Sequence, residues 1–177
     1  MVVSGQNENI NNNLKNIQEE EHFITFQDIV KDKEIKTYLE MGDKYLGTLG
    51  YTNHSLLHAQ RVAKIAHMIL ISLNYDRRTA ELARIAGYIH DIGNVINRAD
   101  HAQSSAMMAF NILTRMGMAP LEIAKVIGAI GNHDEGTGIP VNSLASALII
   151  ADKTDVRRSR VKTRDNKDFD ICLLYTS

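Results

Sequence analysis

The chain has 177 residues, the length of one globular domain with a sizeable core. Apolar residues make up 44% and charged residues 23%, which excludes a fibrous or wholly disordered chain. Because 20 Lys and Arg nearly balance 21 Asp and Glu, nothing calls for a nucleic-acid partner. No apolar run is long enough to cross a membrane and the first residues lack a secretory signal, so we expect a cytoplasmic protein.

The chain divides into three parts. Residues 1–24 are rich in Asn and lack a helical apolar period, which predicts a disordered polar leader. Residues 25–165 carry successive stretches of helical spacing, and residues 166–177 predict a frayed tail. The end of this tail resembles a translated sequencing adapter, in which case Cys172 carries no information; the alternative is an ordinary frayed tail. As Cys172 is the single cysteine, neither an intramolecular disulfide nor a thiolate metal cluster is possible.

Turn and capping signals divide the middle part into helices. Asn53, Asp76 and Pro120 favour helix starts, and Gly50 and Gly117 favour helix ends. Long alternating strand patterns are absent and the loops are short, which predicts an all-α, compact multi-helix bundle. The expected helices cover Phe26–Val30, Lys33–Leu49, Asn53–Leu73, the residues after Asp76 with an end in His90-Asp91-Ile92-Gly93, His101–Met116, Pro120–His133, and a last one from Asn142 or Ser143.

Asp152 ends an apolar stripe on the last of these helices. Ala145, Leu148 and Ile149 share its face. A carboxylate on an inward face is costly unless it is paired or binds a metal, so we expect Asp152 to be a ligand. The alternative is a helix that ends here and leaves Asp152 in solvent.

Histidines extend apolar stripes in the same way on other helices. They are His58, His90 next to Asp91, His101 and His133. Each one alone is more often a hydrogen-bonded core or cap residue than a ligand. Together, imidazole and carboxylate donors from successive helices indicate a centre for Mn, Zn, Co, Ni or Fe rather than Ca.

In chain order, these residues resemble the HD superfamily of metal-dependent phosphohydrolases. The pattern is an early His58, the tandem His90-Asp91 followed by Ile92-Gly93, and a later Asp152, and the similarity covers about residues 52–160. It implies a bundle of HD-domain type in which His58, His90, Asp91 and Asp152 hold a divalent metal ion and form the catalytic set.

Two-metal members of the superfamily have further histidines to which His101 and His133 are similar, so the resemblance implies one or two ions per chain. The branch that cleaves cyclic dinucleotides has His-His-Glu where this chain reads Asn132-His133-Asp134. This difference argues against a cyclic dinucleotide as the substrate.

The activity implied is hydrolysis of a phosphate ester, in a nucleotide or related small phosphorylated substrate, by a metal-activated water. Lys153 and Arg157 follow Asp152 at helical spacing and offer cations to phosphate, unless they belong to a solvated face. Arg160 and Arg164 are interpreted as solvated. His54 lies one turn before His58, where it either faces substrate or helps the helix to start.

Two other functions remain open. A non-catalytic HD-type module that binds a nucleotide or a partner usually lacks a metal ligand, and none of the four core residues is missing here. An HD-type oxygenase would hold two irons, so the identity of the metal separates it from a hydrolase. The seven methionines leave room for a homodimer surface.

Overall fold

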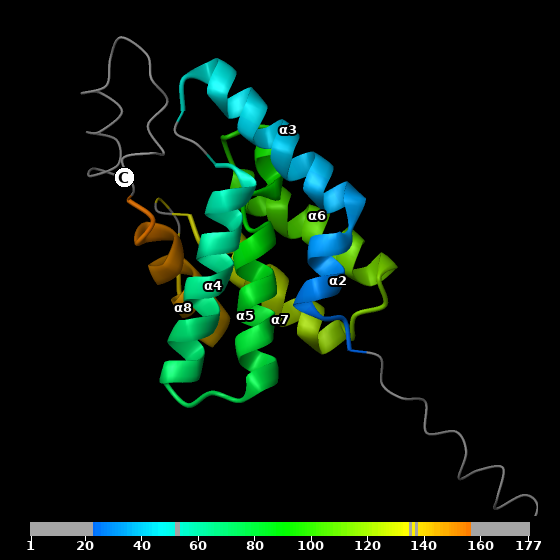
Figure 1. The fold of residues 1–177 in the computed structure, drawn as a ribbon, viewed down its shortest axis with the longest axis vertical. Helices are drawn as coiled ribbons and strands as arrows, with labels where there is room; N and C mark the ends of the chain where they lie inside the picture. Colours follow the sequence, from blue (N-terminus) through cyan, green and yellow to red (C-terminus); the bar gives the residue numbers. More distant parts are fainter. Residues whose placement is uncertain (1–22, 52–53, 135, 137, 157–177) are drawn as a thin grey trace, which may run out of the picture.

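The structure is a computed structural model that describes residues 23–51, 54–134, 136 and 138–156 (Figure 1). No strand occurs among these residues, so the predicted all-α bundle is confirmed. The predicted leader lies largely outside the described residues, as do Arg157, Cys172 and the predicted tail. The elements are α2 (Phe26–Lys31), α3 (Lys33–Leu49), α4 (Leu56–Ser72), α5 (Arg77–Ile89), the 3-10 helix η1 (Ile92–Val95), α6 (His101–Arg115), α7 (Pro120–Gly131) and α8 (Ser143–Lys153).

Most helix bounds follow the local signals. Asp76 caps α5 by accepting a hydrogen bond from the Thr79 N–H, and Gly50 ends α3 in the left-handed region at φ 89°. The start of α4 differs from the prediction, because Ser55 and not Asn53 is its N-cap. The helix ends also differ: α5 and α7 stop at Ile89 and Gly131, so His90 and His133 follow the helices rather than lie within them.

Helices α4 and α5 form an antiparallel pair, and the chain leaves α5 at the end where α4 begins (Figure 1). Their backbones approach closely at Gly87, where a Cβ atom would lie 2.9 Å from the Cα atom of Ala63. The glycine therefore has a packing role. The pair places the first turn of α4 beside the last turn of α5, which brings His58 near His90.

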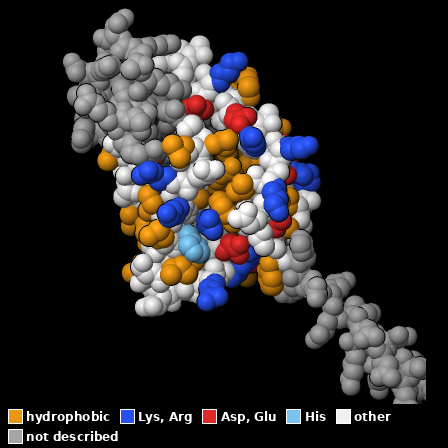
Figure 2. Space-filling view, viewed as in Figure 1, with side chains coloured by type: hydrophobic (Ala, Val, Ile, Leu, Met, Phe, Trp, Pro, Cys, Tyr) orange, Lys and Arg blue, Asp and Glu red, His pale blue; other side chains and the backbone are white. Residues whose placement is uncertain are grey.

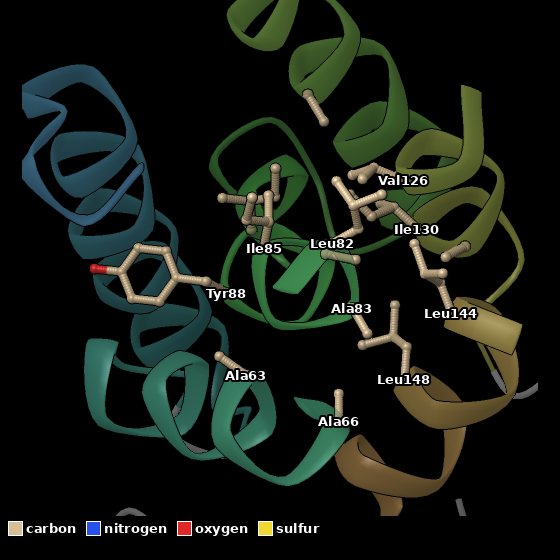
Figure 3. Packing of buried hydrophobic residues seen from close by; sticks show 14 of the residues in the cluster. Ala63, Ala66, Leu82, Ala83, Ile85, Tyr88, Val126, Ile130, Leu144 and Leu148 are labelled. Atoms are coloured by element: carbon tan, nitrogen blue, oxygen red, sulfur yellow. The ribbon is translucent and has the colours of Figure 1, made fainter. Parts of the chain in front are cut away.

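Helix α5 lies at the middle of the core. Figure 3 shows it nearly end-on, with Leu82 directed toward Val126 of α7 and Ala83 toward Leu148 of α8. On another side Tyr88 meets the ring of Phe26 edge-on, with centroids 5.6 Å apart. Because α5 is covered on several sides, the residues at its end are held firmly relative to the neighbouring helices.

The segment after α5 is tied to α6 through Gly93. The Gly93 N–H donates to the Ser105 hydroxyl at 2.8 Å, and a Cβ atom on Gly93 would lie 2.6 Å from the carbonyl oxygen of His101. Only glycine allows such an approach. This contact fixes the start of α6 beside Asp91, so His101 faces the end of α5.

A charged cluster joins the start of α5 to α7 and to the chain before α2. The guanidinium of Arg78 donates to Glu122 at 2.6 Å, to Glu81 at 3.1 Å and to the carbonyl oxygen of Ile24 at 2.9 Å. We call these four residues the Arg78 cluster. The N–H groups of this partly buried guanidinium thus have acceptors within the fold.

The surface mixes apolar and charged side chains. Figure 2 shows apolar side chains gathered in the middle of one face, with Lys, Arg and acidic side chains around them. Within the described part of the chain, none of the helices has the length and apolar character to cross a membrane. The homodimer surface stays a prediction.

Candidate metal centre

Side chains from three helix ends meet at the end of the bundle where α4 starts. His58 comes from the first turn of α4, His90 and Asp91 follow α5, and Asp152 lies in the last turn of α8. The Asp152 Oδ1 atom lies 3.1 Å from His58 Nε2 and 3.6 Å from His90 Nε2. The Asp91 Oδ2 atom lies 3.7 and 3.3 Å from the same two nitrogens. The structure thus brings together the four residues predicted to hold a first metal ion.

His101 and His133 lie on the other side of Asp91. The Nε2 atom of His101 is 3.4 Å from Asp91 Oδ1, and the ring of His133 packs edge-on against His90 and His101 with centroids 4.9 and 5.1 Å apart. We call these six residues the His–Asp centre: the first half is His58, His90, Asp152 and Asp91 Oδ2, and the second half is His101, His133 and Asp91 Oδ1.

Backbone carbonyls hold three of the imidazoles at Nδ1. A carbonyl only accepts, so each Nδ1 carries a proton, and Nε2 is the nitrogen whose lone pair is available in the neutral, metal-binding form. The carbonyls near a helix C-terminus lack partners in the helix, which is why His90 and His133 each find one three residues back. The pairs are His90 with Gly87 at 2.9 Å, His101 with Arg98 at 3.1 Å and His133 with Ile130 at 2.6 Å.

A carboxylate holds the fourth imidazole. Asp155 Oδ2 lies 2.8 Å from His58 Nδ1, and both side chains are buried. Arg61 approaches the other oxygen of Asp155 at 3.9 Å. A carboxylate behind an imidazole fixes its tautomer and raises its basicity, an arrangement common around protein metal ions.

The buried Nε2 atoms of His58 and His90 have no hydrogen-bond partner among the described residues. The 3.1 Å distance from His58 Nε2 to Asp152 Oδ1 would suit a hydrogen bond, but the proton of His58 already points to Asp155. Two acceptors that face each other repel unless a cation lies between them. This donor set, with its lone pairs and carboxylates directed inward, therefore fits a divalent metal ion.

The charges of the centre also favour a cation. Burial disfavours the charged form of His90, but Asp91 and Asp152 outweigh it and raise the pKa of His90 to about 10. Burial likewise opposes ionisation of Asp91, yet His90, His54 and His101 hold the pKa of Asp91 well below its usual range. The carboxylates therefore stay ionised, and positive charge collects between them as a proton or a metal ion.

The pKa of His133 shifts in the opposite direction, although Asp91 and Asp152 act on it as they do on His90. Burial, and then the charge of His90, lower the pKa of His133 to about 4. Burial also lowers the pKa of His101. Both imidazoles are thus neutral at pH 7, which is the form that binds metals.

The other predicted site residues are less central. His54 is nearly buried at the edge of the centre, where its Nε2 lies 3.9 Å from Asp91 Oδ2 and its backbone N–H donates to Asp43. Lys153 follows Asp152 on α8 and is exposed. Arg157, like Arg160 and Arg164, lies outside the described residues.

Two residues near the centre were missed by sequence reasoning. Asp155 follows Asp152 by three residues, a helical spacing that could have suggested a second inward carboxylate. Arg98 lies in the turn before α6, with its Nη1 atom 3.8 Å from Asp91 Oδ1. A turn has no periodic pattern, so no signal in the sequence marked this arginine.

Residues 56–157, more than half of the chain, match the HD domain family. The chain belongs to the HD family. Helices α4 to α8, and with them all six residues of the His–Asp centre, lie within the matched segment.

Similar proteins include curated sequences and a crystal structure. An uncharacterized protein of Methanocaldococcus jannaschii is 26% identical over an alignment of 161 residues, and the match covers 77% of this HD chain and 61% of that protein. Ribonuclease Y of Opitutus terrae is 30% identical over an alignment of 119 residues, and the match covers 65% of this chain and 21% of the enzyme. The chain thus spans about three fifths and one fifth of the lengths of these two relatives.

The crystal structure is that of a predicted HD superfamily hydrolase from an uncultured Thermotogales bacterium. It has a TM-score of 0.55 and 28% sequence identity, and the similarity covers 70% of this chain and 67% of that one. The fold and the family relation therefore agree.

Proposed function

We propose that this HD protein is a metal-dependent phosphohydrolase that cleaves a phosphate ester in a nucleotide or related small phosphorylated substrate. The observation that carries the proposal is the first half of the His–Asp centre. Two buried imidazole lone pairs and two carboxylates converge there, and they need a cation between them.

His58, His90, Asp91 and Asp152 would hold the metal ion. Mixed nitrogen and oxygen donors suit Mn, Zn, Co, Ni or Fe, and four protein donors leave room for a further ligand on most of these ions. When bound, such an ion lowers the pKa of a water molecule and offsets negative charge on a phosphoryl oxygen.

The protein residues supply orientation and charge. Asp155 fixes the ring of His58, and the Gly87 carbonyl fixes the ring of His90, so both Nε2 lone pairs are aimed before a ligand arrives. Asp152 is 26% exposed while His58 and His90 are buried, so substrate would enter on the Asp152 side. We propose that His54, Lys153 and Arg157 contact the substrate from this rim.

The experiment that tests the proposal is elemental metal analysis of protein purified without chelator, together with hydrolysis of bis(p-nitrophenyl) phosphate and p-nitrophenyl phosphate. We expect Mn, Co, Ni or Zn in the wild type, and loss of both metal and hydrolysis in Asp91→Asn. Glu40→Gln is the matched control, because Glu40 forms an exposed ion pair with Lys36 on α3.

Two outcomes would contradict the proposal. Wild-type protein that binds no metal after reconstitution would be a binding module instead. Paired iron with oxygen consumption and no ester hydrolysis would favour the HD-type oxygenase, for which His101 and His133 would complete a second iron site.

A further inference from the structure

An arginine side chain faces the second half of the His–Asp centre. Arg98 lies in the turn between η1 and α6, and its side chain is 32% exposed. Its Nη1 atom is 3.2 Å from His101 Nε2 and 3.8 Å from Asp91 Oδ1. The guanidinium is therefore directed at the two atoms that a second metal ion would bind.

Arg98 contacts both ring nitrogens of His101, one through its backbone carbonyl oxygen and the other through its side chain. The Arg98 carbonyl oxygen lies 3.1 Å from His101 Nδ1 and accepts its proton, which leaves Nε2 as the acceptor for the Arg98 Nη1 donor. An imidazole lone pair binds one cation at a time. A second metal ion and Arg98 would thus compete for the same lone pair and the same Asp91 oxygen.

The positions of the donor atoms agree with this competition. In the described part of the chain, two sets of three residues have donor atoms that all lie within 4.8 Å of one another. The first set is His58, His90 and Asp152, and the second is His90, Asp91 and His133. Neither set includes His101, and the second set shares His90 with the first. The second half therefore has no three-donor set of its own.

The net charge of the centre indicates why a cation such as Arg98 would be needed to bind phosphate. Two ionised carboxylates offset the double charge of one divalent ion, so a substrate phosphate would meet a centre with no net positive charge from these groups. A guanidinium adds one positive charge that cannot be lost near pH 7, and its planar N–H groups match phosphate oxygens. Lys153, in contrast, is exposed, and Arg61 faces Asp155 behind His58.

We propose that Arg98 is the second cation of the centre: its guanidinium, instead of a second metal ion, faces Asp91 Oδ1 and His101 and binds the phosphoryl oxygen of the substrate. This inference rests on the proposed phosphohydrolase and deepens it, because it makes the chain a one-metal enzyme with an arginine in place of the second ion. Arg98 is then a residue that touches the substrate.

The test measures metal and phosphate binding by titration calorimetry, with Mn²⁺ alone and with inorganic phosphate in the presence of Mn²⁺. The variants are Arg98→Met and Arg98→Lys, with Arg77→Met as a control because Arg77 is an exposed arginine at the far end of α5. Circular dichroism checks that each variant is folded.

We expect one equivalent of Mn²⁺ in the wild type and in the control. Arg98→Met should weaken phosphate binding about 10- to 100-fold while the first Mn²⁺ binds as before, and Arg98→Lys should recover part of the loss. A second equivalent of Mn²⁺ in Arg98→Met would show the competition directly. A single equivalent with weakened phosphate binding would also support the assignment, since the second half then lacks a metal site of its own.

Two equivalents of Mn²⁺ in the wild type would overturn the inference and leave the phosphohydrolase standing. Unchanged phosphate affinity in Arg98→Met would overturn it as well. Wild-type protein without any bound Mn²⁺ would instead contradict the proposed function itself, so the two failures are distinguishable.

Discussion

The two ends of α5 hold polar groups of opposite kinds. At its start, the Arg78 guanidinium donates to two carboxylates and a carbonyl, so its N–H groups have acceptors within the fold. At its end, His90 is fully buried, and its Nε2 atom faces the oxygens of Asp91 and Asp152 without a hydrogen bond. One end is complete as folded, and the other requires a proton or a metal ion.

This difference indicates that the start of α5 serves the stability of the fold and that its end serves ligand binding. A hydrogen-bonded ion cluster such as that of Arg78 needs no ligand, whereas buried groups without partners cost free energy that the rest of the fold must offset. The apolar contacts around α5, such as those of Leu82 and Ala83, can supply that offset. The unmatched end is thus where a ligand would bind with most effect.

The largest expected effect on stability follows from Arg78→Met. The substitution leaves Glu81, Glu122 and the Ile24 carbonyl without their shared donor, and we expect it to lower the free energy of unfolding by about 2–3 kcal/mol. Urea denaturation monitored by circular dichroism measures the change. The Mn²⁺ affinity of the folded variant should equal that of the wild type, and a weakened affinity would break the separation of the two ends.

The next effect concerns the other end of α5. Asp155→Ala removes the acceptor behind His58, and we expect Mn²⁺ affinity to fall about 10- to 100-fold in titration calorimetry. Asp155→Asn keeps an oxygen acceptor but loses the charge, so its effect should be smaller. Equal losses in the two variants would mean that the charge of Asp155 alone supports the imidazole of His58, and unchanged affinity in both would contradict the role of Asp155.

The fold was predictable because its signals are local. Asp76 caps a helix by accepting from Thr79, three residues away, and Gly50 and Gly117 adopt the positive φ values that end helices. The predicted start of α4 was wrong because Asn53 is as good a capping residue by type as Ser55. The side chain of Ser55 makes no capping hydrogen bond, so no local signal favoured it.

The residues of the centre were predictable only in part. His58 and Asp152 stand out as polar residues on apolar stripes, which periodicity can detect. Asp155 follows the end of α8, and its burial depends on His58, 97 residues earlier in the chain. Arg98 acquires its role from the turn that Gly93 allows, so only the packed structure reveals it.

A smaller effect is expected from a pair of glycine substitutions. Gly87→Ala places a Cβ atom 2.9 Å from Ala63 backbone atoms, which should force α4 and α5 apart and cost about 1–2 kcal/mol. Gly128→Ala, with its nearest neighbour at 3.6 Å, should stabilise by about 0.5–1 kcal/mol through helix propensity. Thermal melts measure both. Gly87→Ala should also weaken Mn²⁺ binding, because His58 and His90 lie on the separated helices.

The smallest expected effect is the pH dependence of stability from Asp76, a carboxylate that caps α5 far from the His–Asp centre. Hydrogen bonds from the Thr79 hydroxyl and N–H hold the pKa of Asp76 below its ordinary value of 3.8. Because the pKa is lower in the folded state, the capping stabilisation is complete above about pH 5 and is lost as the pH falls through the folded pKa. Asp76→Asn keeps the cap but does not titrate, so the difference in melting temperature from the wild type should stay constant above about pH 5 and change below it. Its Mn²⁺ affinity at pH 7 should be unchanged, since Asp76 belongs to the end of α5 that is complete without a metal.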